Sequence, residues 1–552
     1  MKRRSFIKSL GAVGASALLP STWPTAFNMS TMYKAANSAI NYSGVNIAAP
    51  SIMPQVINIF LYGGPSELSG NLTNIVDINA SSQNSYTAAF GNRVVSFDDT
   101  GDATNGFITR HGFWRGTPNN NNPLVDNTDG AGGRDMQYMV DQGYMSVYRT
   151  MMKRKDGTRS HRESILMSQK GSLDIETSAG VGTRIAAMLY QNRAAYEGTT
   201  TFADGTAVDM DNMILPFVSF EGDTRFFAID PDYTLPLLLR GTTLDQDLND
   251  PFTRLNDGNA AALDAMVARK LADPAYSARY AGVISSNGLR EYLAQRIGSV
   301  SNALGALPNV LDASDAADLG INPGEPLQYP NPNNNQYSER IQAAVTLAIE
   351  NPGSLYITVG GGLGGWDDHN NGIDRYRSRM TQLFRALKAA ALHIKYSGNQ
   401  TNATIRTPGT GLDRPTDNIV INVYGDFGRR VNLNNSQGWD HGNNQNLWTI
   451  GGAGVASAAN GGAFRQLGKV VGTTVRVGDP GTNNQVTEPD PAGTGNPNGP
   501  GSYEMEPMSV AASVYSYFGA QNPEILTADE ERNPTGDPAI DETIPGEAPL
   551  FP

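Results

Sequence analysis

Short, predominantly apolar segments that stop at glycine set the strongest limit on how this chain can fold. The segment 56–62, VINIFLY, is followed by Gly63 and Gly64. A strand with one face in water alternates apolar and polar residues, whereas this segment is apolar on both faces. Strands buried on both faces are typical of parallel sheets covered by helices. Further strands of this kind are predicted at residues 144–150, 215–220, 354–362, 417–426, 447–454 and 468–477.

Segments with helical periodicity lie between these strands. They span residues 161–171, 179–192 and 372–398, and the region 255–350 is predicted to be mostly helical. Strands that alternate with helices predict an α/β fold with a mostly parallel sheet. No repeat and no linker interrupts the pattern, so residues 27–552 are predicted to form a single domain. A turn-rich stretch at about 478–502 is predicted to be a loop-rich insertion.

The N-terminal residues match a twin-arginine export signal. Arg3 and Arg4 are followed by Phe6 and Lys8, and then by a modest apolar stretch rich in Gly, Ala and Ser. This stretch is shorter than the about 20 apolar residues of a membrane-spanning helix. We therefore predict a cleaved signal peptide at about residues 1–26, a periplasmic or extracellular location, and no transmembrane anchor after cleavage. The alternative is a basic tail on a cytosolic protein.

Charge and cysteine content exclude several classes of function. The formal net charge is −13, and loss of residues 1–26, with four basic and no acidic residues, would bring it to −17. A nucleic-acid-binding protein would present a basic face, so nucleic acid is not an expected partner. The chain has no cysteine, which excludes disulfides, thiolate metal sites and a cysteine nucleophile. Any metal would need histidine or oxygen ligands.

Polar residues collect where the predicted strands end. In open α/β sheets, ligands bind beyond the carboxyl ends of the strands. Three of the five histidines and several aspartates fall at such ends, and this residue combination predicts a site for one or two divalent ions, zinc, manganese or calcium. The residues concerned are Ser66, Glu67, Ser69, Ser160, His161, Asp367, Asp368, His369, Asp426, Arg429, Arg430, Asp440 and His441.

Each of these features also has a plainer interpretation. The segments GWDDH (365–369) and GWDHG (438–442) could be polar turns, but two glycine-flanked, tryptophan-preceded Asp/His pairs in a histidine-poor chain favour a site. We interpret His393 as structural and His111 as a loop histidine without a task. Arg429 and Arg430 either are surface cations or hold a phosphate or sulfate group through paired hydrogen bonds.

The segments VYRTMM…SH, GGWDDH, GDFGRRV and GWDHGN, in this order behind a twin-arginine signal, resemble a bacterial exported family. It is the family catalogued as domain of unknown function 1501, and the resemblance covers about residues 55–550. It implies an alkaline phosphatase/sulfatase-like fold, which is a three-layer α/β/α sandwich with a mostly parallel central sheet. It also implies a site with two metal ions held by Asp and His, where a serine or threonine attacks a phosphate or sulfate ester.

Site residues follow from the resemblance position by position. It implies metal ligands at Asp367, His369, Asp426 and His441, and Asp368 and Asp440 complete the set of metal-binding residues that we predict. His161 would lie near the nucleophile, for which Ser66 and Ser160 are the candidates. Arg429 would steady the anionic group or anchor Asp426. The chain departs from the family at three positions, with Ser69 in place of Asp, Asp426 in place of Glu, and Asp368 in place of Thr.

Two functions are compatible with these observations. The first is an exported metal-dependent hydrolase that acts on phosphate or sulfate esters, either small anionic esters or a surface polymer. The second is a non-catalytic scaffold on a hydrolase-like fold, which the lost carboxylate at Ser69 would favour. The scaffold would bind a surface polymer or a partner protein, and the resemblance suggests another exported protein for that role.

Overall fold

The structure is a computed structural model of the 552-residue chain. It describes residues 45–71, 109, 111–114, 118–119, 122–126, 131–155, 157–210, 213, 215–229, 234–235, 237, 329–330, 337–361, 363–397, 415–457, 463–465, 467–479, 484–493 and 504–527. The predicted signal peptide at 1–26, most of the predicted helical region 255–350 and part of the predicted insertion at 478–502 lie outside the described residues.

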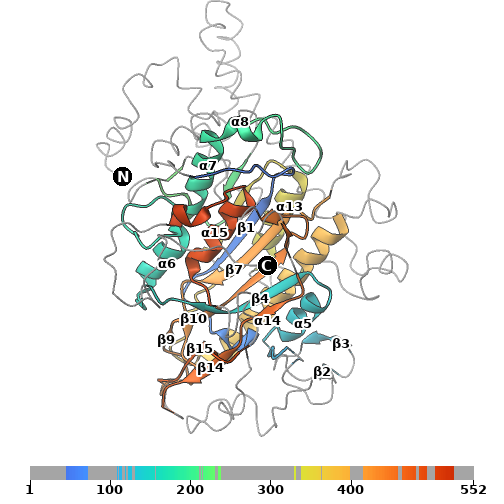
Figure 1. Ribbon diagram of the computed structural model, residues 1–552. Coiled ribbons are helices and arrows are strands. Elements are labelled where there is room, and N and C mark those ends of the chain that lie inside the picture. The colour runs from blue at the N-terminus through green and yellow to red at the C-terminus, as the bar shows by residue number, and fades with distance from the viewer. Residues whose placement is uncertain are drawn as a thin grey trace, which may run out of the picture.

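A seven-stranded sheet lies at the centre of the described chain (Figure 1), in the order β13-β4-β10-β7-β1-β6-β5. β1 pairs in parallel with β6 and β7, β5 with β6, and β13 with β4, whereas β10 runs antiparallel between β4 and β7. The mostly parallel, mixed sheet confirms the α/β class. The strands are β1 (Gln55–Leu61), β4 (Met145–Met152), β5 (Phe217–Ser219), β6 (Tyr356–Val359), β7 (Ile419–Gly425), β10 (Asn444–Gly451) and β13 (Val470–Val471).

Burial of β1 explains its apolar sequence, because all of its residues are buried. Ile57 and Ile59 belong to one hydrophobic cluster, and Val56 and Phe60 belong to another. Alternate residues of a strand point to opposite faces, so β1 has a core on each side. Helices that contribute to the first cluster are α5 (Gly133–Asp141), α13 (Ser338–Glu350) and α14 (Gly372–Ser397), and those that contribute to the second are α7 (Val181–Gln191) and α15 (Pro507–Tyr517).

Shorter elements surround this centre. None of the helices among the described residues is both long and apolar enough to cross a membrane. The remaining elements are the helices α6 (His161–Lys170) and α8 (Arg193–Tyr196), the 3-10 helices η3 (Glu67–Gly70), η4 (Arg225–Phe227) and η7 (Pro523–Thr527), and the strands β2 (Pro118–Asn119), β3 (Asn122–Asp126), β8 (Gly428–Arg429), β9 (His441–Gly442), β11 (Ala456–Ser457), β12 (Ala463–Phe464), β14 (Thr474–Val477) and β15 (Val486–Pro489).

Two predicted strands differ from the observed ones because glycines interrupt them. The segment 468–477 forms β13 and β14 rather than one strand, and Gly472 between them has a φ of 85°. The segment 447–454 ends as a strand at Gly451, which has a φ of 71°. Extended strands require negative φ values, so a residue with positive φ ends the pairing. The helices predicted at 161–171, 179–192 and 372–398 are confirmed as α6, α7 and α14.

The sheet brings the loops after β1, β6 and β7 to one edge. β1 lies between the other two strands and pairs in register with both, with Leu61 opposite Gly425. The turn after β1 lies very close to the loop after β6. A Cβ added to Gly63 would lie 2.6 Å from the backbone nitrogen of Asp367. A Cβ on Gly64 would lie 2.5 Å from the carbonyl oxygen of Phe427. Only glycine therefore lets the three loops pack this closely.

Acid should destabilise the fold through His393 on α14. This side chain is 6% exposed, and its Nδ1 lies 3.2 Å from the hydroxyl of Tyr329. Burial lowers its pKa from 6.5 to about 4, so below pH 6.5 the unfolded chain binds a proton that the folded chain does not. The contribution to stability is complete above pH 6.5 and is lost as the pH falls through 4, by up to about 3 kcal/mol. Urea unfolding between pH 7 and pH 4 should show a smaller pH dependence for His393→Gln, and an equal dependence in both proteins would contradict this assignment.

Candidate metal centre

Four side chains from three segments that are far apart in sequence meet at this edge of the sheet. Asp367 Oδ1 lies 3.0 Å from His369 Nε2, 3.3 Å from His161 Nε2 and 3.5 Å from His441 Nε2. The Nε2 atoms of His369 and His441 are 2.9 Å apart. The donor atoms of His161, Asp367 and His441 all lie within 4.8 Å of one another, so this set alone could hold a metal ion. We call these four residues the His/Asp cluster.

Two of the histidines are oriented by oxygen atoms on the far side of their rings. His441 Nδ1 lies 2.8 Å from the backbone oxygen of Arg159, which can only accept, so Nδ1 carries the proton. His161 Nδ1 lies 2.6 Å from Asp426 Oδ2. This hydrogen bond raises the pKa of His161, whereas burial, followed by the charge of Arg429, lowers the pKa of His441. When neutral, both rings present an Nε2 lone pair to the cluster.

The third histidine has the same orientation. His369 Nδ1 lies 3.5 Å from Asp440 Oδ1, and its Nε2 faces Asp367 and His441. Asn434 Nδ2 donates to the same Asp440 oxygen at 3.0 Å and so fixes the carboxylate. The Nε2 atoms of all three histidines therefore lie close to one carboxylate oxygen, Asp367 Oδ1. Oxygen groups that hold the outer ring nitrogens are the usual support of histidine metal ligands.

Four of the distances between these donor atoms match the spacing of ligands around a small divalent ion. Ligands about 2.0–2.1 Å from a tetrahedral zinc ion lie about 3.3 Å from one another. The distances recorded within the cluster run from 2.9 to 3.5 Å. Imidazole nitrogen with one carboxylate suits zinc or manganese, whereas calcium prefers shells made only of oxygen. The residues present therefore fit zinc or manganese better than calcium.

Asp426 occupies a different place from the ligand position that the family resemblance implies. Its side chain is fully buried, with Oδ1 accepting the N–H of Gly63 at 3.1 Å and Oδ2 facing His161. Both carboxylate oxygens are therefore engaged behind the ring of His161. The structure places His161 in the cluster and Asp426 behind it as the group that orients the ring.

Asp368 lies outside the cluster, although its neighbours on both sides belong to it. Its carboxylate is 3.0 Å from Arg379 and 3.3 Å from Arg375, both on α14. Burial raises the pKa of Asp368, and the two arginines act in the opposite direction. The side chain therefore joins the loop after β6 to α14. Asp440 borders the cluster through His369, as described above, rather than facing its centre.

Arg429 holds the loops of the site together. The residue is 1% exposed. Its guanidinium donates hydrogen bonds to the backbone oxygens of Gly64 at 2.7 Å, Trp439 at 3.0 Å and Trp366 at 3.3 Å, and also to that of Gly63. A further hydrogen bond of 2.7 Å reaches Asp367 Oδ1. The sequence left two roles open for Arg429, and its contacts match an anchor, although for Asp367 rather than for Asp426.

The two candidate nucleophiles lie in different surroundings. Ser66 is 2% exposed, and its Oγ accepts the N–H of Leu68 as the N-cap of η3. Ser160 is exposed, directly precedes His161, and makes no capping hydrogen bond although it stands at the N-cap position of α6. Ser69 is fully buried and its Oγ donates to the carbonyl of Ala131, so the position of the lost carboxylate contributes nothing to the cluster.

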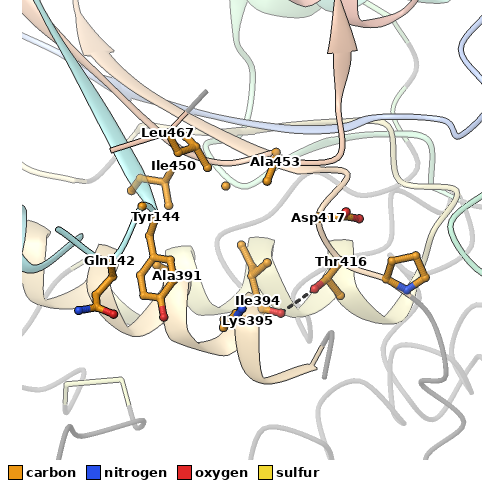
Figure 2. Close-up of a pocket in the computed structure, with 14 residues that line it drawn as sticks. Gln142, Tyr144, Ala391, Ile394, Lys395, Thr416, Asp417, Ile450, Ala453 and Leu467 are labelled. Carbon is orange, nitrogen blue, oxygen red and sulfur yellow. Dashed lines mark hydrogen bonds between the residues drawn. The ribbon is translucent and has the colours of Figure 1, made fainter. Parts of the chain in front are cut away.

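A second hollow lies at the opposite edge of the sheet (Figure 2). It has a volume of about 450 Å³ and lies next to the beginnings of β4 and β7 and the end of β10. Tyr144, Ile394, Lys395, Asp417 and Ile450 are among the residues that line it. No histidine is among its described lining residues, so it lacks the imidazole groups that the His/Asp cluster has at the other edge.

Comparison with known proteins adds no further constraint. No protein-family model matches the chain, and a search of curated proteins found no match.

Two residues that support the His/Asp cluster were not predicted from the sequence, Arg159 and Asn434. A backbone carbonyl has no signal in the sequence, so the contact from Arg159 to His441 could not have been predicted. The segment NLNNSQG (432–438) indicated only a polar turn.

Proposed function

We propose that this chain is an exported metal-dependent hydrolase of phosphate or sulfate esters, with the three-layer fold of the alkaline phosphatase and sulfatase superfamily. The observation that carries the proposal is that the Nε2 atoms of three histidines face one oxygen of Asp367. Lone pairs held this close repel one another unless a cation or a proton lies between them. The two hydrophobic clusters on either side of β1 support the three-layer arrangement.

His161, Asp367 and His441 are the proposed ligands, and His369 borders the fourth position. A divalent ion at this site would supply Lewis-acid polarisation of the ester oxygen. Asp426 keeps the Nδ1 proton of His161 in place, and the carbonyl of Arg159 does the same for His441. These contacts leave each ring only one nitrogen to offer, which preorganises the donor set.

Ser160 is the serine that we assign to the attacking role. A substrate can reach its hydroxyl because the residue is exposed, and it is bonded directly to a proposed metal ligand, His161. The hydroxyl of Ser66 is buried and engaged in a cap, so it could not attack without breaking η3. Attack by the Ser160 hydroxyl would break the bond between the phosphorus or sulfur and the ester's alcohol, and the alcohol would leave with the proton of the hydroxyl. The resulting serine ester would then be hydrolysed by water to free phosphate or sulfate and serine.

Replacement of Ser160 by alanine should therefore lower kcat by at least about 100-fold without changing the metal content. Ser66→Ala is the matched control. It should keep the wild-type kcat while it costs about 1 kcal/mol of stability through the lost cap. Steady-state kinetics, elemental analysis and thermal unfolding of both variants test this. Full activity in Ser160→Ala would transfer the attack to a water molecule.

The proposed function is tested by metal analysis and by turnover. The purified protein should contain zinc or manganese in stoichiometric amount and should hydrolyse 4-nitrophenyl phosphate or 4-nitrophenyl sulfate. Protein that takes up neither ion on incubation would contradict the proposal. Bound metal without turnover would favour the second candidate, a non-catalytic scaffold. Ser69 supports that candidate, because the residue that replaces the family's carboxylate is turned into the core.

A further inference from the structure

Arg429 cannot recognise a substrate without giving up existing contacts. Its side chain donates to backbone oxygens of four residues and to Asp367, and it is 1% exposed. A guanidinium has five N–H groups. Nε donates to Gly64, Nη1 faces Trp439 and, at 3.4 Å, His369 Nε2, and the two N–H groups of Nη2 serve the other three contacts. A phosphate or sulfate ester would nevertheless need cationic hydrogen-bond donors at the site. They must come from residues other than Arg429.

Arg159 is placed to supply such donors. Its backbone oxygen accepts from His441 Nδ1 at 2.8 Å, so the residue lies against a proposed metal ligand. The residue is exposed, and its Nε donates to the amide oxygen of Asn443 at 3.1 Å. No ion pair joins Arg159 to a carboxylate among the described residues. Its backbone therefore contacts the His/Asp cluster, and its guanidinium has no carboxylate partner among the described residues.

A second arginine, Arg430, contacts the segment that carries His441 through its backbone. Arg430 directly follows Arg429, and its N–H donates to the backbone oxygen of Asp440 at 2.9 Å, next to His441 in the chain. Its side chain donates to Asn484 Oδ1 at 2.7 Å and lies 4.0 Å from Asp440 Oδ2. Burial, together with repulsion from Arg430, lowers the pKa of Arg159. An anion between the two groups would relieve this repulsion.

The other cations near the cluster are committed elsewhere. Lys153 is fully buried, and its Nζ donates to the carbonyl of Thr158 at 2.6 Å and to the hydroxyl of Ser164. Arg162 is exposed but pairs with Glu176 at 2.9 Å. Of these three cations, Arg159 is the one that both contacts the cluster through its backbone and has no carboxylate partner among the described residues, so it is the one available to bind an anion. Arg162, two residues beyond Ser160 on α6, offers a matched control.

We propose that Arg159, with Arg430 beside it, binds the anionic group of the substrate, and that this group is the dianion of a phosphate monoester. The inference rests on the proposed function, because it concerns the substrate of the same site. A guanidinium offers paired N–H donors that match two oxygens of a tetrahedral anion. Two guanidiniums beside a divalent ion attract a dianion more strongly than the single charge of a sulfate monoester.

Binding of inorganic phosphate and inorganic sulfate, measured by calorimetry at pH 8 on metal-loaded protein, tests the proposal. We expect phosphate to bind the wild-type protein, and Arg159→Ala to weaken it about ten- to a hundredfold. Arg159→Lys should recover only part of the loss, since an ammonium lacks the paired donors. Arg162→Ala should bind phosphate as the wild type does. Metal content and melting temperature should be the same in all four proteins.

The outcomes separate this inference from the proposed function. Equal phosphate affinity in Arg159→Ala and wild type, or a wild-type protein that binds no phosphate at millimolar concentration, would overturn the inference even if esters are hydrolysed. Faster hydrolysis of 4-nitrophenyl sulfate than of 4-nitrophenyl phosphate would overturn the assignment to phosphate monoesters. Arg159-dependent phosphate binding in a protein that hydrolyses no ester would uphold the binding site while the hydrolase proposal fails.

Discussion

Replacement of His441 by alanine should leave the protein without its metal ion and without ester hydrolysis. The ring of His441 supplies one of the three donor atoms that lie within 4.8 Å of one another, together with His161 and Asp367. Removal of His441 leaves His161, Asp367 and His369, and His369 does not belong to the set of donors within 4.8 Å of one another, so the variant should hold zinc or manganese much more weakly. His161→Ala and Asp367→Ala should behave in the same way. Elemental analysis after gel filtration and kinetics on 4-nitrophenyl phosphate measure both losses.

Variants at two other histidines test whether the loss of metal is specific to the three proposed ligands. His369 lies 2.9 Å from His441 but outside the set of three, so His369→Ala should still bind metal with an affinity lowered about 10- to 100-fold. His111 contacts Asp141 at 4.0 Å and has no atom in the cluster, so His111→Ala should keep both metal and activity. Stoichiometric metal in His441→Ala would show that the cluster is not the binding site.

The sequence pattern was sufficient for the sheet but not for every strand direction. The runs at 56–62 and 417–426 are buried on both faces, and they form β1 and β7 of the sheet. β10 is just as buried, yet it is antiparallel to both of its neighbours. Burial determines which residues are apolar, and it contains no information on whether neighbouring strands run the same way. The relative direction of two neighbouring strands depends on the chain segments that connect them, and the periodicity of apolar residues gives no information on those segments.

The site could be located from the sequence, but individual roles could not. The rule that ligands bind beyond strand ends brought His161, His369 and His441 to one edge, where the structure also places them. Asp367 and Asp368 are adjacent, and only the loop conformation decides that the first faces the cluster and the second faces the arginines of α14. Side-chain direction in an irregular loop has no period that could have predicted this.

The place of Asp426 likewise depended on contacts between distant segments. It is fixed by the N–H of Gly63 and by His161, at sequence separations of 363 and 265 residues. A residue-by-residue transfer of ligands from a family cannot see that both oxygens are already engaged. This explains why the resemblance implied Asp426 as a ligand, whereas the structure places it behind His161.

Replacement of Arg429 by alanine should destabilise the protein by roughly 3–5 kcal/mol. The substitution would leave the backbone oxygens of Gly63, Gly64, Trp366 and Trp439 without their buried donor. These oxygens come from three separate loops, after β1, after β6 and before β9, so the substitution also removes the connection among them. Thermal and urea unfolding measure the loss. Arg429→Lys should recover little of it, because one ammonium cannot reach oxygens on several sides of a planar guanidinium.

A variant of an exposed arginine is the control for this loss of stability. Arg162→Ala breaks an exposed pair with Glu176 and should change the free energy of unfolding by less than about 1 kcal/mol. If Arg429→Ala kept the wild-type stability and lost only activity, Arg429 would have to contact the substrate instead of the loops. A large loss of stability would mean that Arg429 holds Asp367 and the surrounding backbone in place. Recognition of the anion would then depend on the neighbouring arginines, because every donor of Arg429 is already used within the fold.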